Sequence, residues 1–333
     1  MGKIQILDCT LRDGGYVNNW EFGEDAIHAI CRTLADVGVD IAELGFMRNE
    51  PYTKDRAIYS SVSQFAKAVG EKSSGLTYAA LIEMANYFPP DTLSDRTPEG
   101  PDAIRYSFWM RCMDEAYEYC ARIRDKGYLL CCQPTRVEQY SDEQFADMCR
   151  RFSKLDPYAL YIVDTFGLLR KDDLLRYARI GHENLAPGII LGYHAHDNMG
   201  QAFSNACAFV DQDYGERTVQ VDATIGGIGR GAGNLRLEMI LEYLNETKDT
   251  QYDLTSVYRV WDEHIEAVRH SHPWGFDFPY FIAAANGCSP NYAGYFISHG
   301  LSVSEIKKAI MRIRGDDKFL YSDEKAARYA QCI

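Results

Sequence analysis

GIILGYHAHDN, residues 188–198, joins an unbroken apolar run to two histidines and decides how this chain folds. A strand without polar alternation cannot face water, so the run is typical of a parallel sheet that is covered on both faces. Residues two apart in a strand point to the same side, and His194 and His196 can therefore reach one point. The stretch predicts a buried strand whose carboxyl end carries either a metal site or a pair of satisfied polar histidines.

Seven more short apolar runs alternate with longer segments of helical period. All eight runs are 4–9, 41–46, 77–82, 104–109, 129–134, 160–164, 189–196 and 219–225. Helices are expected near 24–37, 54–70, 111–126, 142–154, 171–184, 199–212 and 234–246. This α/β alternation predicts a closed (β/α)8 TIM barrel. An open doubly wound sheet is the alternative, but no Gly-x-Gly-x-x-Gly turn follows the first run.

The strand rhythm stops near residue 249. Residues 253–269 and 303–314 have helical patterns, and an aromatic, proline-containing stretch at 272–291 joins them. We therefore expect a catalytic barrel domain over 1–248 and a C-terminal helical appendage over 249–333. The appendage either packs on the barrel or forms part of an interface between identical subunits.

Composition excludes several classes of function. A net charge of −13 gives no general attraction to nucleic acid or to anionic membranes. The amino terminus carries no charged, apolar signal region and no apolar run is long enough to cross a membrane, so a cytoplasmic protein is expected. The ten cysteines include no Cys-x-x-Cys pair, which disfavours a zinc–thiolate site.

Polar residues gather at the carboxyl ends of the expected strands, where barrel enzymes keep their active sites. Asp13 follows the first strand, and barrel closure brings it towards His194 and His196 across the eighth strand. Asn234 approaches from the loop after that eighth strand. These nitrogen and oxygen ligands suit Mn²⁺ or Mg²⁺, while Co²⁺, iron or Zn²⁺ remain alternatives. Asp13 can also be read as a turn residue before Gly14.

Three motifs together resemble a known superfamily. Residues 8–14 (DCTLRDG), 194–198 (HAHDN) and 229–234 (GRGAGN) are similar to signatures of the metallolyases that include 3-hydroxy-3-methylglutaryl-CoA lyase and 2-isopropylmalate synthase. Within that superfamily the chain most resembles the 4-hydroxy-2-oxovalerate aldolases. The resemblance covers about residues 3–246, and residues 291–295 (NYAGY) resemble a Tyr-Ala-Gly segment near the active site of those aldolases.

The resemblance implies a metal-dependent class II aldolase that makes or cleaves a bond between a pyruvate-like enolate and an aldehyde. Asp13, His194 and His196 would hold the metal, with Asn234 beside them. Arg12 would stabilise the charge on the carbonyl oxygen and contact substrate. Glu43 would pair with Arg12, although it can also be read as a polar residue inside the barrel. Thr165 would bind the substrate carboxylate, although it can also be read as a packed residue at a strand end.

Tyr16 marks a departure from those aldolases, which carry a catalytic histidine at the corresponding position. Tyrosine is a poor base at neutral pH. Either Tyr16 works beside the metal, or Tyr292 carries the proton, or substrate or water does. The appendage also diverges from the region through which those aldolases dock a dehydrogenase, so no such partner is implied.

Two other activities remain open from the sequence. One is Claisen condensation of an acyl-CoA with a 2-oxo acid, and the other is binding of a metal or an oxo acid without catalysis. The glycine-rich loop at 226–234 contains Arg230 and has two interpretations. It is either a tight turn that positions Asn234 or a binding loop for a phosphorylated or nucleotide-linked aldehyde.

Overall fold

The computed structural model describes residues 2–331, and its centre is a closed parallel barrel. The eight barrel strands are β1 (Ile4–Asp8), β2 (Ile41–Met47), β4 (Thr77–Glu83), β5 (Ala103–Phe108), β6 (Leu129–Pro134), β7 (Ala159–Asp164), β8 (Ile190–Ala195) and β9 (Val219–Ala223). Closure is complete because β1 pairs in parallel with both β2 and β9. The predicted (β/α)8 barrel is confirmed, and all eight predicted runs contain strands.

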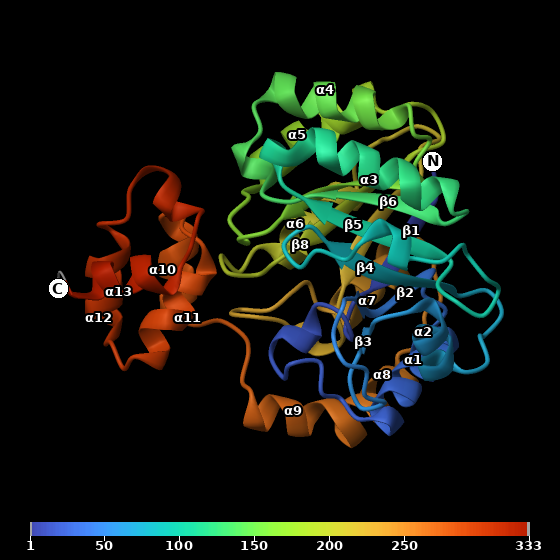
Figure 1. The fold of residues 1–333 in the computed structure, drawn as a ribbon, viewed down its shortest axis with the longest axis horizontal. Helices are drawn as coiled ribbons and strands as arrows, with labels where there is room; N and C mark the ends of the chain where they lie inside the picture. Colours follow the sequence, from blue (N-terminus) through green and yellow to red (C-terminus); the bar gives the residue numbers. More distant parts are fainter. Residues whose placement is uncertain (1, 332–333) are drawn as a thin grey trace.

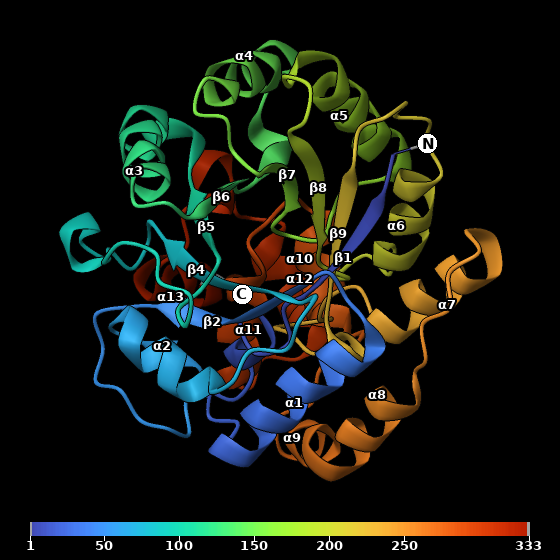
Figure 2. The ribbon, with the colours of Figure 1, turned by 90° about the vertical axis from the view of Figure 1, so that its right-hand side faces the viewer.

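Helices surround the strands, as the ribbon in Figure 2 shows, and those that connect one strand to the next or follow the last strand come first in the chain. They are α1 (Glu24–Val37), α2 (Val62–Val69), α3 (Met113–Asp125), α4 (Asp142–Ser153), α5 (Lys171–Asn184), α6 (Ala202–Val210) and α7 (Leu237–Thr247). The connection from β4 to β5 has no α-helix and contains only a 3-10 turn, Pro90–Thr92. This absence agrees with the sequence, which shows no helical period there.

The expected helix over 54–70 is wrong in its first half. Residues 58–59 form a short strand, β3 (Ile58–Tyr59), beside β2, and α2 begins only after Ser61, whose side chain accepts a hydrogen bond from the Gln64 backbone. Gly45 explains the close approach of the two segments. Its φ is +134°, and a Cβ there would lie 2.0 Å from the carbonyl oxygen of Ala57.

The chain beyond α7 divides into two parts. The first, α8 (Thr255–Val260), a π-helical turn (Trp261–Ile265) and α9 (Glu266–Ser271), runs along α1 on the outside of the barrel. The second part holds α10 (Phe278–Ala285), α11 (Pro290–Ser298), α12 (Val303–Ile310) and α13 (Asp323–Gln331) around a separate apolar core. Figure 1 shows this bundle set apart at one end of the barrel. The C-terminal helices are thus present, while the domain boundary at 248/249 stays a prediction.

The bundle of α10–α13 lies at the carboxyl ends of the strands. Phe319 stacks on Phe166, which follows β7, with ring centroids 6.1 Å apart. Tyr280 lies so close to Gly231 in the loop after β9 that a Cβ at Gly231 would come within 3.0 Å of its ring. The appendage therefore stands beside the barrel mouth.

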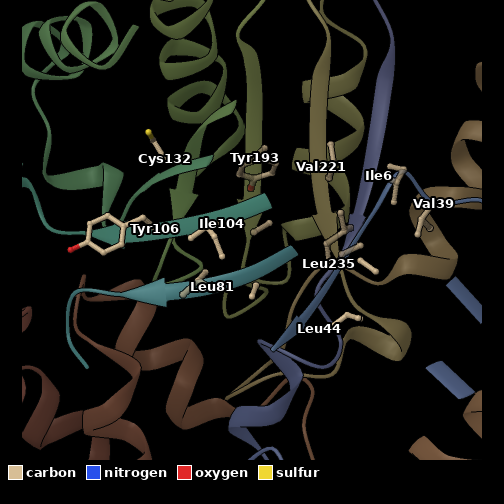
Figure 3. Close-up of a cluster of buried hydrophobic side chains, with 14 of the residues drawn as sticks. Ile6, Val39, Leu44, Leu81, Ile104, Tyr106, Cys132, Tyr193, Val221 and Leu235 are labelled. Carbon is tan, nitrogen blue, oxygen red and sulfur yellow. The ribbon is translucent and has the colours of Figure 1, made fainter. Parts of the chain in front are cut away.

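The largest apolar core fills the space between the strands and their surrounding helices. Figure 3 shows part of it, with Ile6, Ile104 and Val221 from three different strands. Inside the barrel the apolar cluster is smaller and includes Leu7 and Tyr161. No helix in residues 2–331 is long and apolar enough to cross a membrane.

Candidate active site

His194, His196 and Asp13 meet at the barrel mouth. His194 lies in β8, His196 follows it directly, and Asp13 stands in the loop after β1. One ligand atom from each of the three lies within 4.8 Å of the other two. Asp13 Oδ2 is 3.6 Å from His194 Nε2 and 3.2 Å from His196 Nε2. The predicted convergence across the last strand is present, because β9 pairs with both β8 and β1.

Hydrogen bonds on the far side of each imidazole fix its tautomer. His194 Nδ1 lies 2.9 Å from Asp222 Oδ2, and His196 Nδ1 lies 2.9 Å from the backbone oxygen of Asp164. A carbonyl or carboxylate oxygen only accepts, so each Nδ1 carries the hydrogen, and a neutral ring would have its Nε2 lone pair free for a metal ion bound between it and Asp13. This orientation is the one that metal-binding histidines use.

These three residues fit a divalent cation. Asp13 Oδ2 is buried and makes no hydrogen bond within residues 2–331. Ligands about 2.1 Å from one ion stand roughly 3–3.5 Å apart, close to the spacing found here. Burial raises the pKa of Asp13, but Arg12 and His196 outweigh it and hold that pKa well below its usual range. Asp13 is therefore ionised, and the three atoms form a site able to hold a divalent metal.

Arg12 belongs to a buried network of charges below this cluster. Its Nε donates to Glu43 Oε2 at 2.6 Å and its Nη1 to Asp13 Oδ1 at 2.6 Å. Glu43 Oε2 also accepts from Arg105 at 2.7 Å, and Arg105 pairs in turn with Asp222. Because Asp222 also contacts His194, these contacts form a closed ring that begins at Asp13 and ends at His194. The predicted Arg12–Glu43 pair is present.

Nη2 of Arg12 makes no hydrogen bond in the described chain, and Arg12 lines the cavity at the barrel mouth. Its other two nitrogens are fixed by Glu43 and Asp13. The guanidinium is therefore held rigidly with one donor edge left for a ligand.

Asn234 and Thr165 both lie near the cluster. The backbone of Asn234 forms an isolated bridge with that of His196, and its Nδ2 donates to the Ile228 carbonyl at 2.9 Å. Its Oδ1 is buried without a hydrogen bond in residues 2–331, as a ligand oxygen would be. Thr165 lines the cavity, and its Oγ1 accepts the Arg136 backbone N–H at 2.7 Å. This leaves the Thr165 hydroxyl hydrogen available as a donor.

The two tyrosines occupy different places. Tyr16 lines the cavity and its hydroxyl donates to Glu83 at 3.3 Å. Burial and the nearby Glu83 raise the pKa of Tyr16. The structure does not bring Tyr292 to the site. Its side chain is buried in the appendage core, where the hydroxyl donates to the Asp317 carbonyl at 2.7 Å. The sequence placed Tyr292 by its motif, but packing of α11 in the bundle decides its direction.

A cavity of about 240 Å³ opens beside the cluster. Its lining comprises Arg12, Asp13, Tyr16, Phe46, Leu81, Glu83, Ala85, Ser107, Phe108, Trp109, Gln133, Thr135, Arg136, Val163, Thr165, His194, His196 and Arg230. The volume suits a small organic molecule.

Sequence reasoning missed several residues of this site. Asp222 and Arg105 sit within apolar strands and are almost completely buried. A charge inside an apolar strand was the available signal, because such a residue must find a partner within the barrel. Glu83 and Arg136 stand at strand ends and carried the same signal as the residues that were identified.

The comparisons with known proteins agree with this geometry. The family model described as HMGL-like matches residues 108–263. The 4-hydroxy-2-oxovalerate aldolase of Carboxydothermus hydrogenoformans is 25% identical over 330 residues, which cover 93% of this chain and 90% of that protein. Residues 108–263 are thus similar to the HMGL-like family.

Other relatives carry the names of different reactions. The oxaloacetate decarboxylase of Mycobacterium tuberculosis is 23% identical over 244 residues, 72% of this chain and 69% of that protein. Among solved structures, the N-terminal domain of a candidate aldolase from Bacteroides vulgatus has a TM-score of 0.74 and 22% identity, over 89% of this chain and 97% of that one. That likeness supports the barrel fold.

Proposed function

We propose that this protein is a divalent-metal-dependent aldolase that joins or splits a pyruvate-like 2-oxo acid and an aldehyde. The observation that carries the proposal is the convergence of Asp13, His194 and His196 beside the free edge of Arg12. Relatives named as 4-hydroxy-2-oxovalerate aldolases support a lyase of this type. Its partners would be small molecules, and we infer Mn²⁺ or Mg²⁺ from the mixed nitrogen and oxygen ligands.

The reaction makes one carbon–carbon bond. A C–H bond of the 2-oxo acid methyl group breaks, its proton goes to a base, and the resulting enolate carbon attacks the aldehyde carbon. The aldehyde oxygen then takes up a proton and the product is a 4-hydroxy-2-oxo acid. Asp13, His194 and His196 would hold a divalent ion, which would supply Lewis-acid stabilisation of negative charge on oxygen.

Three side chains take defined parts in this scheme. Arg12 is fixed by Glu43 and Asp13 and donates its free Nη2 to the 2-oxo acid as negative charge develops on it. The Thr165 hydroxyl donates to the substrate carboxylate. Tyr16 remains a phenol at neutral pH because its pKa is raised by burial, so it gives a proton to the aldehyde oxygen rather than acting as a free base.

Proton exchange tests the function without knowledge of the aldehyde. Pyruvate in D₂O should lose its methyl protons, followed by NMR, when the protein carries Mn²⁺, Mg²⁺ or Co²⁺, and should retain them after chelation. Asp13→Ala and His194→Ala should abolish both metal binding and exchange. Arg12→Ala should bind metal and lose exchange, while Arg179→Gln, on the outer side of α5, should behave as wild type.

Absence of exchange with all three metals would overturn the proposal. Incubation of pyruvate with acetyl-CoA separates the Claisen alternative, since that reaction frees the CoA thiol and an aldolase frees none. Thiol release would replace the aldolase assignment with the condensing one.

A further inference from the structure

The cavity beside the metal cluster has more arginines in its lining than the proposed reaction uses. Its lining contains three arginines, Arg12, Arg136 and Arg230, against two carboxylates, Asp13 and Glu83. This contrasts with a chain whose net charge is −13. Arg12 is already assigned to the 2-oxo acid, so the other two arginines need a separate explanation.

Arg136 follows β6 and has no counter-ion. In residues 2–331 its guanidinium takes part in no ion pair or hydrogen bond, and its only described partner is the ring of Phe166, 5.4 Å away. Burial lowers the pKa of Arg136, which is the mark of a cation that has lost water without gaining a carboxylate. The residue also holds φ at +60°, a conformation that costs a side chain about 1 kcal/mol.

Arg230 approaches the same cavity from the glycine-rich loop after β9. It too forms no ion pair within the described chain, and its guanidinium carbon lies 4.9 Å from the Tyr16 ring centroid. This contact places Arg230 next to the phenol assigned to the aldehyde oxygen. The two arginines come from loops on β6 and β9, with β7 and β8 between them in the sheet.

The nearby acids do not neutralise these two cations. Glu83 pairs with Arg48 at 2.5 Å, and Asp13 pairs with Arg12. Glu138 lies two residues after Arg136, and burial and the charge on Asp164 raise the pKa of Glu138 to about 8. Neither carboxylate oxygen of Glu138 makes a hydrogen bond in residues 2–331, so Glu138 is not paired with the Arg136 guanidinium.

We propose that Arg136 and Arg230 bind an anionic group, a phosphate or a carboxylate, on the aldehyde substrate. The inference rests on the proposed aldolase function and narrows its second substrate to aldehydes that carry a negative charge. Guanidinium groups match the geometry of both anions and pair with them in two-pronged hydrogen bonds. The aldehyde carbon accepts the enolate while the anionic group stays unchanged, so the proton and electron balance is that of the simple aldol addition.

Pairs of aldehydes that differ in charge provide the test. Kinetics of pyruvate consumption should be compared between glyceraldehyde 3-phosphate and glyceraldehyde, and between succinic semialdehyde and butanal. The charged member of one pair should be favoured in kcat/KM by about 10-fold or more, the range for a charge-assisted hydrogen bond. The first pair reports a phosphate site and the second a carboxylate site.

Single substitutions locate the effect. Arg136→Gln and Arg230→Gln should each lower kcat/KM for the favoured charged aldehyde by about 10- to 100-fold, mainly through KM. Both variants should have a kcat/KM for the uncharged aldehyde of the same pair within about threefold of the wild-type value. Arg179→Gln is the matched control, an arginine that also forms no ion pair but lies on the outer side of α5.

The outcomes separate this inference from the proposed function. Pyruvate proton exchange without any preference for a charged aldehyde, or an equal loss on charged and neutral aldehydes in the variants, overturns the anion site and leaves the aldolase standing. Loss of exchange in the wild type overturns the aldolase itself. A preference that disappears in Arg136→Gln or Arg230→Gln while exchange persists supports the inference.

Discussion

Tyr16 stands at the position where the resemblance to the hydroxy-oxovalerate aldolases implies a catalytic histidine. Its hydroxyl donates to Glu83, and Glu83 is held by Arg48. Burial and Glu83 both disfavour the phenolate, so the Tyr16 pKa is raised. A group of this kind donates a proton well and removes one poorly. We therefore assign Tyr16 to the oxygen of the aldehyde and not to the methyl group of the 2-oxo acid.

Removal of that hydroxyl gives a direct prediction. Tyr16→Phe should lower the rate of aldol addition about 10²- to 10⁴-fold, the usual contribution of a positioned acid. Metal binding and exchange of the pyruvate methyl protons should persist, because neither uses Tyr16. The measurements are steady-state kinetics, metal titration and NMR exchange on the same preparation.

Tyr292→Phe is the control, since it deletes a hydroxyl that bonds to Asp317 inside the appendage. It should keep wild-type turnover. An equal loss in both variants would mean that Tyr292 reaches the site and that the present assignment is mistaken.

At the scale of elements, Gly45 in β2 controls how the barrel wall meets β3. Phe46 donates its backbone N–H to Ala57 at 3.1 Å, and the strand register shifts between Glu43 and Phe46. No side chain fits at Gly45 because the Ala57 carbonyl occupies the place of the Cβ. The same bend carries Glu43 and Phe46, which hold and cover Arg12.

Gly45→Ala should destabilise the protein by on the order of 3 kcal/mol, from a backbone overlap and an unfavourable φ. Gly38→Ala is the comparison, because Gly38 ends α1 at a φ of +82° but has no atom near its missing Cβ. That change should cost about 1 kcal/mol. Urea denaturation measures both, and equal losses would contradict the steric explanation.

The elements of the barrel were predictable because each strand is buried on both faces and each helix shows one apolar side. The sequence over 54–61 predicts a helix that does not form, since the packing of this segment against β2 depends on contacts distant in sequence. The helices α10, α11 and α13 were not identified in their aromatic surroundings. They bury their apolar residues against one another, and that packing is not visible in the period of any single helix.

The metal cluster was predictable from strand ends and barrel closure. The residues that hold it were not, because pairing of Asp222 with His194 and Arg105 depends on which side chains face each other inside the barrel. Tyr292 shows the opposite error. A short motif resembled an active-site segment, whereas the fold of the appendage turned its tyrosine inward.

For the whole molecule, the buried ring of charges predicts that stability depends on a bound divalent cation. The ring contains two arginines, Arg12 and Arg105, and three carboxylates, Asp13, Glu43 and Asp222. The carboxylates outnumber the arginines, so the ring has a buried net negative charge. A bound divalent cation would make that net charge positive. Burial lowers the pKa of His194, but Asp13 and Asp222 outweigh that effect and raise it, because both carboxylates favour a positive charge at this place.

Metal should therefore stabilise the folded chain. Mn²⁺ at 100 times its dissociation constant adds about 2.7 kcal/mol to the free energy of unfolding. The melting temperature, measured by calorimetry, should rise by a few degrees with Mn²⁺ and fall on chelation. Asp13→Asn should remove this response, and Asp172→Asn, on the exposed start of α5, should retain it. A response that survives in Asp13→Asn would place the bound ion elsewhere.

The two imidazoles of the cluster are oriented by acceptors of different kinds. His194 depends on the side chain of Asp222, whereas His196 depends on the backbone oxygen of Asp164. A point mutation can delete the first acceptor, but no exchange of side chains at residue 164 deletes the second. As sequences diverge, the geometry of His196 is inherited with the strand itself, while that of His194 must be preserved by selection on a second residue. Change in metal preference among descendants of this chain is thus expected to begin at residue 222.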